Sequence, residues 1–160
     1  MTLPAFKFPK SFSTAMSLVP AYTHSLLFSH ALNLALSRMI KPELLEPLHG
    51  KLISIRVTDA GVSFFFTVDR TGFVACKHRG KTPDLAISAS AYDFVLLGTR
   101  KEDPDTLFFS RRLVVEGDTE LGLVAKNTLD AVELPKLDAS CFSPDRVIER
   151  IGSRLFPAPR

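Results

Sequence analysis

Tryptophan is absent from this chain of 160 residues, and tyrosine and cysteine occur only twice each, whereas phenylalanine occurs thirteen times. Cys76 and Cys141 lie far apart and have no paired-cysteine spacing. This argues against a zinc cluster, a redox motif or a disulfide framework, and favours a reducing cytoplasm. Hydrophobic residues make up 46% of the chain and charged residues 23%, which is typical of a folded domain and not of a disordered segment. Because phenylalanine carries no polar group, the fold must bury a large amount of pure hydrocarbon.

Recognisable catalytic motifs are also absent. We find no phosphate-binding glycine run, nucleophile elbow, His-Glu-x-x-His metal pair or dinucleotide fingerprint, and we predict no cofactor and no metal. The formal net charge of +3 comes without a clustered aromatic platform, so no nucleic-acid interface is indicated. An enzyme would need a site built from scattered residues such as Cys76, His78 and Asp93. The sequence therefore favours a binding function over catalysis.

No charged side chain occurs from Ser11 through Ser37. Pro20 interrupts this stretch and polar residues are spread through its second half, so it is a poor membrane span. It also lacks the compact apolar core and small-residue cleavage site of a signal peptide. We expect residues 1–20 to form a flexible leader, and residues 21–160 to form one domain that begins with an apolar helix over 21–40. The expected location is the cytoplasm, with peripheral association at the inner membrane as an alternative.

The expected helix over 21–40 has a narrow polar stripe and a broad apolar face. Its polar residues recur every fourth position, at Ser25, Ser29, Asn33 and Ser37. The apolar face has three possible environments: the core of the protein itself, a membrane interface, or a partner. If the helix docks on a membrane or partner, we expect the contact to involve Leu27, Phe28 and Leu32.

From Lys51 onward the helical period gives way to alternation. Segments 51–58, 62–68, 73–78 and 84–88 read as strands joined by short turns, which predicts an antiparallel meander. A fifth strand is expected over 111–116. Helix starts are indicated at Ser90, Asp103, Asp118 and Ser143, where a capping side chain or a proline precedes an apolar run, so the carboxylates there are read as caps. The fold class is therefore α+β, with a five-stranded, mainly antiparallel sheet covered by helices.

A family resemblance appears between residues 100 and 127. The runs Asp103–Phe109 (DPDTLFF) and Arg111–Leu123 (RRLVVEGDTELGL) and the pair Lys126-Asn127 resemble the C-terminal signature of bacterial sterol carrier protein type 2 lipid-binding domains. In particular, they resemble the accessory factors of oxygen-independent ubiquinone synthesis. The resemblance implies helices that enclose an apolar lipid cavity against a five-stranded sheet. It also implies a non-catalytic protein that holds isoprenoid quinone precursors for the hydroxylation proteins UbiU and UbiV, which would carry the iron–sulfur clusters.

The resemblance supplies no catalytic residue, so candidate lipid contacts come from the faces of the expected elements. Inward-facing apolar residues of the sheet and the later helices are expected to line the cavity: Phe64, Phe66, Phe94, Leu97, Phe108, Phe109, Leu121, Val124 and Leu129. Ordinary core packing explains the same residues equally well, because alternation does not distinguish a filled interior from a hollow one. A general carrier or membrane-docking module for sterols, fatty acids or acyl thioesters is the alternative function.

Overall fold

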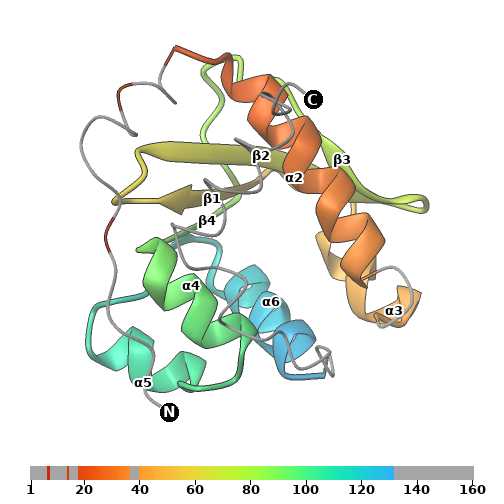
Figure 1. The fold of residues 1–160 in the computed structure, drawn as a ribbon. Helices are drawn as coiled ribbons and strands as arrows, with labels where there is room; N and C mark the ends of the chain where they lie inside the picture. The colour runs from red at the N-terminus through yellow and green to blue at the C-terminus, as the bar shows by residue number, and fades with distance from the viewer. Residues whose placement is uncertain (1–6, 8–13, 15–17, 37–39, 132–160) are drawn as a thin grey trace, which may run out of the picture.

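The computed structural model describes residues 7, 14, 18–36 and 40–131, which form a five-stranded sheet with helices (Figure 1). The expected α+β class with an N-terminal helix is confirmed. The elements, in chain order, are α2 (Ala21–Leu36), α3 (Pro42–Leu45), η1 (Glu46–Leu48), β1 (Ile53–Val57), β2 (Val62–Asp69), β3 (Gly72–Ala75), β4 (Leu85–Ala89), α4 (Ala91–Gly98), α5 (Pro104–Phe109), β5 (Val114–Gly117) and α6 (Thr119–Ala131). The predicted helix that starts at Ser143 and most of the predicted leader lie outside the described residues, and the domain limits stay a prediction.

The strand order is β3-β2-β1-β4-β5, and this corrects the predicted meander. Three of the neighbouring pairs are antiparallel, whereas β1 and β4 run parallel. The connection after β3 is long enough to cross two strands about 5 Å apart, so β4 lies beyond β1 and not beside β3. Asp84 fixes this position, because its carboxylate accepts a hydrogen bond from the Leu52 N–H (2.7 Å) and its own N–H donates to the Leu52 carbonyl (2.8 Å).

Helix starts follow the predicted caps. The Ser90 hydroxyl accepts a hydrogen bond from the Asp93 N–H, and the Asp103 carboxylate accepts one from the Asp105 N–H. Asp118 does the same for the N–H groups of Glu120 and Leu121 at the start of α6. The capping signals in the sequence therefore placed α4, α5 and α6 correctly.

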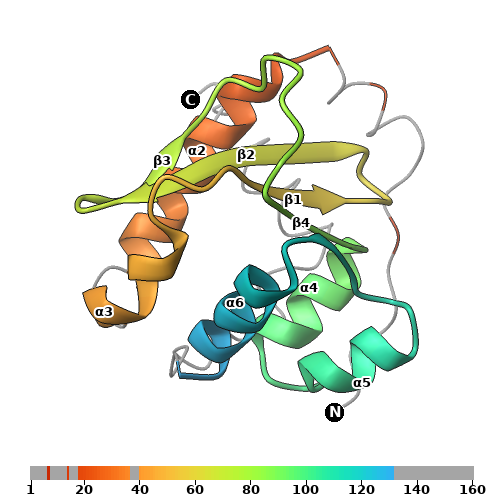
Figure 2. The same ribbon diagram turned by 180° about the vertical axis from the view of Figure 1, so that it is seen from behind.

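A row of apolar residues crosses one face of the sheet, and the helices pack on this face. The pairing registers align Phe64, Ile55, Ile87 and Val115 across β2, β1, β4 and β5, so their side chains share a face. Phe28 of α2 stacks on Phe64 with ring centroids 4.2 Å apart, so α2 covers this face at the β2 end. Figures 1 and 2 both show α4, α5 and α6 grouped together, away from α2. The same face is thus covered by two separate groups of helices.

Helix α2 turns its polar stripe toward the sheet. The Ser25 hydroxyl accepts a hydrogen bond from the Phe65 N–H (2.8 Å), and Ser25 and Ser29 are both buried. Asn33 accepts from the Phe73 N–H (2.8 Å) and donates to the Phe73 carbonyl (2.7 Å), as a neighbouring strand would. Two members of the polar stripe, Ser25 and Asn33, therefore satisfy backbone groups on β2 and on the edge strand β3.

The consequence is an outward apolar surface on α2. Leu26, Leu27 and Leu34 are 53%, 73% and 81% exposed. The expected helix over 21–40 ends at Leu36 as far as it is described, because residues 37–39 lie outside the described part. None of the helices in the described part of the chain has the length and apolar character that crossing a membrane requires.

Candidate functional site

An apolar pocket of about 670 Å³ lies between the sheet and the group of α4, α5 and α6. Its floor is formed by Ile55, Ile87 and Val115, three members of the apolar row across the sheet. Its walls are the helices, and the apolar wall residues are Phe94, Leu97, Gly98, Pro104, Phe108, Leu113, Gly122, Leu123 and Ala125. The volume lies within the range of pockets that hold small molecules, and apolar lining of this kind suits a hydrocarbon guest.

The polar lining residues form a rim, which we define as the α4–α5 connection with the first turn of α5, together with Thr119 and Lys126 of α6. The charged members of the rim are Arg100, Lys101, Glu102, Asp103, Asp105 and Lys126. Lys126 Nζ lies 2.7 Å from a carboxylate oxygen of Asp105, and this ion pair joins α6 to α5 at the pocket. The site thus combines a hydrocarbon interior with one charged border.

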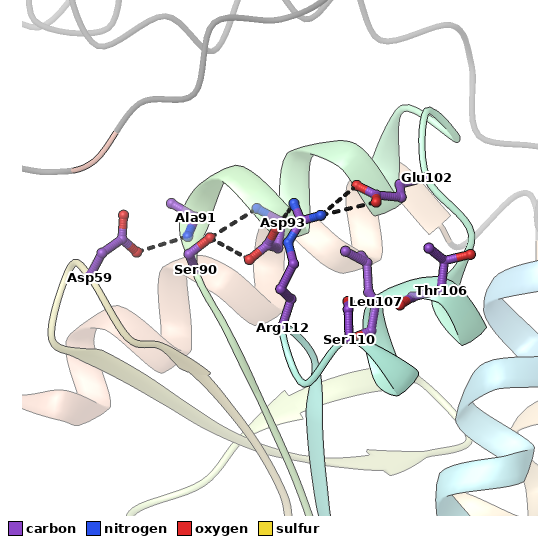
Figure 3. A network of polar contacts seen from close by, with 9 residues as sticks. All are labelled: Asp59, Ser90, Ala91, Asp93, Glu102, Thr106, Leu107, Ser110 and Arg112. Carbon is purple, nitrogen blue, oxygen red and sulfur yellow. Dashed lines mark hydrogen bonds and ion pairs between the residues drawn. The ribbon is translucent and has the colours of Figure 1, made fainter.

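A cluster centred on Arg112 fixes the helices that form the walls (Figure 3). Its guanidinium donates hydrogen bonds to the Asp93 carboxylate on α4 and to both oxygens of Glu102, the latter at 3.0 Å. Burial tends to lower the pKa of Arg112, but the hydrogen bond and attraction to Asp93 and the contacts with Glu102 outweigh it, so the pKa lies above its ordinary value. Arg112 is therefore charged throughout the working pH range and holds α4 beside the turn that follows α5.

Two smaller contacts support the same walls. The Asp59 carboxylate accepts a hydrogen bond from the Ala91 N–H at 2.8 Å, which ties the start of α4 to the β1–β2 turn. The Ser110 hydroxyl donates to the carbonyls of Thr106 and Leu107 at the end of α5. In Figure 3, Asp59 and Ala91 lie on one side of the Arg112 cluster, and Thr106, Leu107 and Ser110 lie on the other. The pocket walls are therefore held by polar contacts outside the apolar lining.

The structure separates the predicted lipid contacts into groups. Phe94, Leu97 and Phe108 line the pocket. Phe64, Phe66, Leu121 and Val124 are not among its lining residues. Phe64 stacks on Phe28, and the other three belong to the core cluster beneath α2 and α6 or pack against it.

Two further predicted contacts stand apart from these groups. Phe109 is 81% exposed and does not line the pocket. Leu129 lies in α6, but its side chain is outside the described part.

Sequence reasoning missed the floor of the pocket. Ile55, Ile87 and Val115 alternate inward on their strands, so a signal existed, but assigning them to one row requires the parallel pairing of β1 with β4. The residues of α2 that were predicted to dock on a membrane or partner differ in their exposure. Leu27 is exposed, whereas Phe28 and Leu32 are half-buried and pack against the core.

The scattered residues considered for catalysis have other partners. The ring of His78 stacks on Phe65 with centroids 4.3 Å apart, and Cys76 follows β3 on the same connection. Asp93 binds Arg112 and the Ser90 hydroxyl. Within residues 18–36 and 40–131, no group of three or more His, Cys, Asp or Glu side chains is placed to hold a metal ion.

Comparisons with known proteins agree with this architecture. The Escherichia coli (strain K12) protein "Ubiquinone biosynthesis accessory factor UbiT" is 37% identical over 129 residues, which cover 81% of this chain and 73% of that protein. The solved structure "UbiJ-SCP2 Ubiquinone synthesis protein" aligns with a TM-score of 0.55 and 20% identity, over 68% of this chain and 94% of the other, and so has the same fold. The SCP-2 sterol transfer family matches residues 28–130, which hold the whole sheet and almost all of the helices around the pocket. A chain with this fold, this pocket and this match belongs to the SCP-2 sterol transfer family.

Proposed function

We propose that the protein is a non-catalytic lipid-binding accessory factor that holds isoprenoid quinone precursors in the apolar pocket. The observation that carries the proposal is the pocket itself, with its floor of Ile55, Ile87 and Val115 and no charged residue except at its rim. Burial of about ten tail carbons, at about 0.8 kcal/mol for each methylene, contributes on the order of 8 kcal/mol before ordering costs. Such binding depends on the tail and needs no catalytic group.

The link to ubiquinone rests on similarity to UbiT, an accessory factor of ubiquinone biosynthesis by its name. We infer that this chain serves the same process under oxygen-free conditions and presents its guest to the hydroxylation proteins UbiU and UbiV. In this division of work the partners perform the oxidation chemistry. This chain shields the tail from water and presents the head group at the rim.

Delivery also requires contact with the membrane in which isoprenoid lipids reside. We propose that the outward face of α2 rests on an anionic bilayer surface. Residues 1–42 contain four basic and no acidic side chains, and residues 70–83 again contain four basic and none acidic. The second segment meets the start of α2, because Lys77 Nζ lies 5.3 Å from the ring centroid of Tyr22. Exposed leucines beside an excess of basic residues match an interfacial helix.

The lipid-holding function is tested by purifying the chain from its own host and analysing it by native mass spectrometry with solvent extraction. We expect an extractable isoprenoid at up to one molecule per chain. Competition with a sterol, a fatty acid and an acyl thioester separates this function from the general-carrier alternative. A preparation that carries no lipid and also fails to bind added quinone precursors would contradict the proposal.

The docking surface is tested by vesicle flotation with the double variant Leu27→Ser, Leu34→Ser. We expect weaker binding to vesicles that contain phosphatidylglycerol, because two exposed leucines no longer enter the interface. The matched control is Val114→Ser, which removes an exposed apolar side chain from β5. Equal flotation of the double variant and the wild type would assign the leucines of α2 to no membrane role.

A further inference from the structure

The rim of the pocket is a set of charges of both signs. Its basic residues are Arg100, Lys101 and Lys126, and its acidic residues are Glu102, Asp103 and Asp105, so the formal charges balance. A guest whose tail enters the pocket must leave its head group near this border, since the charged lining residues are there and the remaining lining is almost entirely apolar.

Two of the acidic rim residues already bind other groups of the protein through their carboxylates. Glu102 binds the guanidinium of Arg112 through both of its oxygens, and Asp103 caps the start of α5. The third, Asp105, is different, because its partner Lys126 comes from the opposite wall and both groups line the pocket. The Asp105 side chain is 53% exposed and that of Lys126 is 33% exposed, so a polar head group can approach the pair.

We propose that the Lys126–Asp105 ion pair determines which head groups the pocket accepts, and that it favours uncharged hydroxylated heads such as an alcohol or a phenol. This inference rests on the proposed lipid-holding function and adds the class of head group. A hydroxyl accepts a hydrogen bond from the ammonium and donates one to the carboxylate while the ion pair stays closed. A charged head is attracted by one member of the closed pair and repelled by the other, so the pair supplies no net countercharge to offset the hydration that the head loses, and acidic and basic heads are both disfavoured.

Removing one member of the pair is therefore expected to change the preferred head-group charge. In Asp105→Asn the Lys126 ammonium loses the negative charge of Asp105, which favours an acidic head. In Lys126→Gln the Asp105 carboxylate loses its cationic partner, which favours an amine. The pair is partly exposed and screened by solvent, so each ratio of dissociation constants is expected to shift by about three- to tenfold.

The experiment measures dissociation constants for a fatty alcohol, a fatty acid and a fatty amine of equal chain length. We expect wild type to bind the alcohol most tightly, Asp105→Asn to gain affinity for the acid relative to the alcohol, and Lys126→Gln to gain affinity for the amine. The swapped variant Asp105→Lys, Lys126→Asp restores a closed pair and is expected to recover the wild-type order. Glu120→Gln and Lys81→Gln are matched controls, because they make the same changes in net charge at exposed sites outside the rim.

The outcomes separate the two proposals. If wild type binds none of the three ligands and no quinone precursor, the lipid-holding function fails and this inference fails with it. If wild type binds them but both single variants keep the wild-type ratios, or the controls shift the ratios as much, the ion pair does not select the head group and only this inference is overturned. A gain for the acid in one variant and for the amine in the other supports it.

Discussion

At the scale of single residues, Asn33 decides how the N-terminal helix meets the sheet. Its amide bonds both backbone groups of Phe73 on the edge strand, so these two groups are satisfied without another strand. The approach is close enough that a Cβ atom at Gly72 would lie 2.4 Å from Asn33 Oδ1, and Gly72 also has a φ of +116°. Glycine is therefore required at this position for both conformational and steric reasons.

Asn33→Ala is expected to destabilise the protein by about 1 to 3 kcal/mol, because two backbone groups of Phe73 lose their partners. Urea unfolding measures the change. Asn127→Ala is the control, since Asn127 is exposed on α6, and it should cost less than about 0.5 kcal/mol. Equal stability of the two variants would show that the Asn33 bonds contribute nothing net.

Asp69 gives the β2–β3 turn a pH dependence. Hydrogen bonds from the side chain and the backbone of Thr71 hold the pKa of Asp69 below its ordinary value of 3.8. Because the folded-state pKa is depressed, the stabilisation is present above the unfolded-state value and is lost as pH falls through the folded-state value.

Asp69→Asn should therefore lower stability at neutral pH and flatten the loss of stability below about pH 4. Thermal unfolding of both proteins from pH 7 to pH 2.5 checks this. Parallel curves over the whole range would contradict it.

At the scale of elements, the pocket walls depend on the Arg112 cluster. Arg112→Lys keeps the charge, but a lysine ammonium lacks the planar guanidinium that donates hydrogen bonds to Asp93 and Glu102 at the same time. We expect a loss of about 1 to 3 kcal/mol in stability, and faster amide exchange in α4 and α5 than in β2. Hydrogen exchange by mass spectrometry measures this, with Arg79→Lys as the exposed control. Uniform exchange changes across the sheet would indicate general destabilisation and not a specific role in the walls.

The elements also show what sequence alone can predict. Ser90, Asp103 and Asp118 signal helix starts because capping is a local interaction, and alternation located all five strands for the same reason. The position of β4 was predicted wrongly, because it depends on contacts between Leu52 and Asp84, 32 residues apart. The side of α2 that packs on the sheet is also determined by contacts between residues far apart in the sequence. Ser25 bonds the backbone of Phe65, 40 residues away, and no helical period in the sequence reveals that contact.

At the scale of the whole molecule, we expect that a side chain added at Gly98 can fill the pocket without disturbing the fold. Gly98 lines the pocket, and a Cβ atom there would meet nothing within 4 Å. Gly98→Phe is expected to reduce bound lipid at least severalfold while it leaves the unfolding midpoint near that of wild type. Gly98→Ala is the matched control and should keep its lipid and gain slightly in stability, because alanine is the better helix former. Native mass spectrometry and thermal unfolding report the two quantities, and full lipid occupancy in Gly98→Phe would place the guest elsewhere.

The candidate site was only partly predictable for a related reason. Phe94, Leu97 and Phe108 come from helices whose apolar faces are visible in the sequence, and they do line the pocket. Phe64 and Phe66 share the face of the pocket floor, but α2 covers their end of the sheet. The position of the pocket on this apolar face depends on how α2 and the group of α4, α5 and α6 pack on the sheet. Contacts between residues far apart in the sequence determine that packing.

The parallel pairing of β1 with β4 has a consequence for the order of folding. Strands β1, β2 and β3 join through short turns and can pair early, whereas β4 joins only after a long loop closes, at a larger entropic cost. We therefore expect the half of the chain that builds the pocket walls to form late and to open more readily in the native state than β1, β2 and β3. If the pocket holds a lipid as proposed, opening of that half alone would expose the lipid while β1, β2, β3 and α2 stay folded, so we expect lipid release without global unfolding.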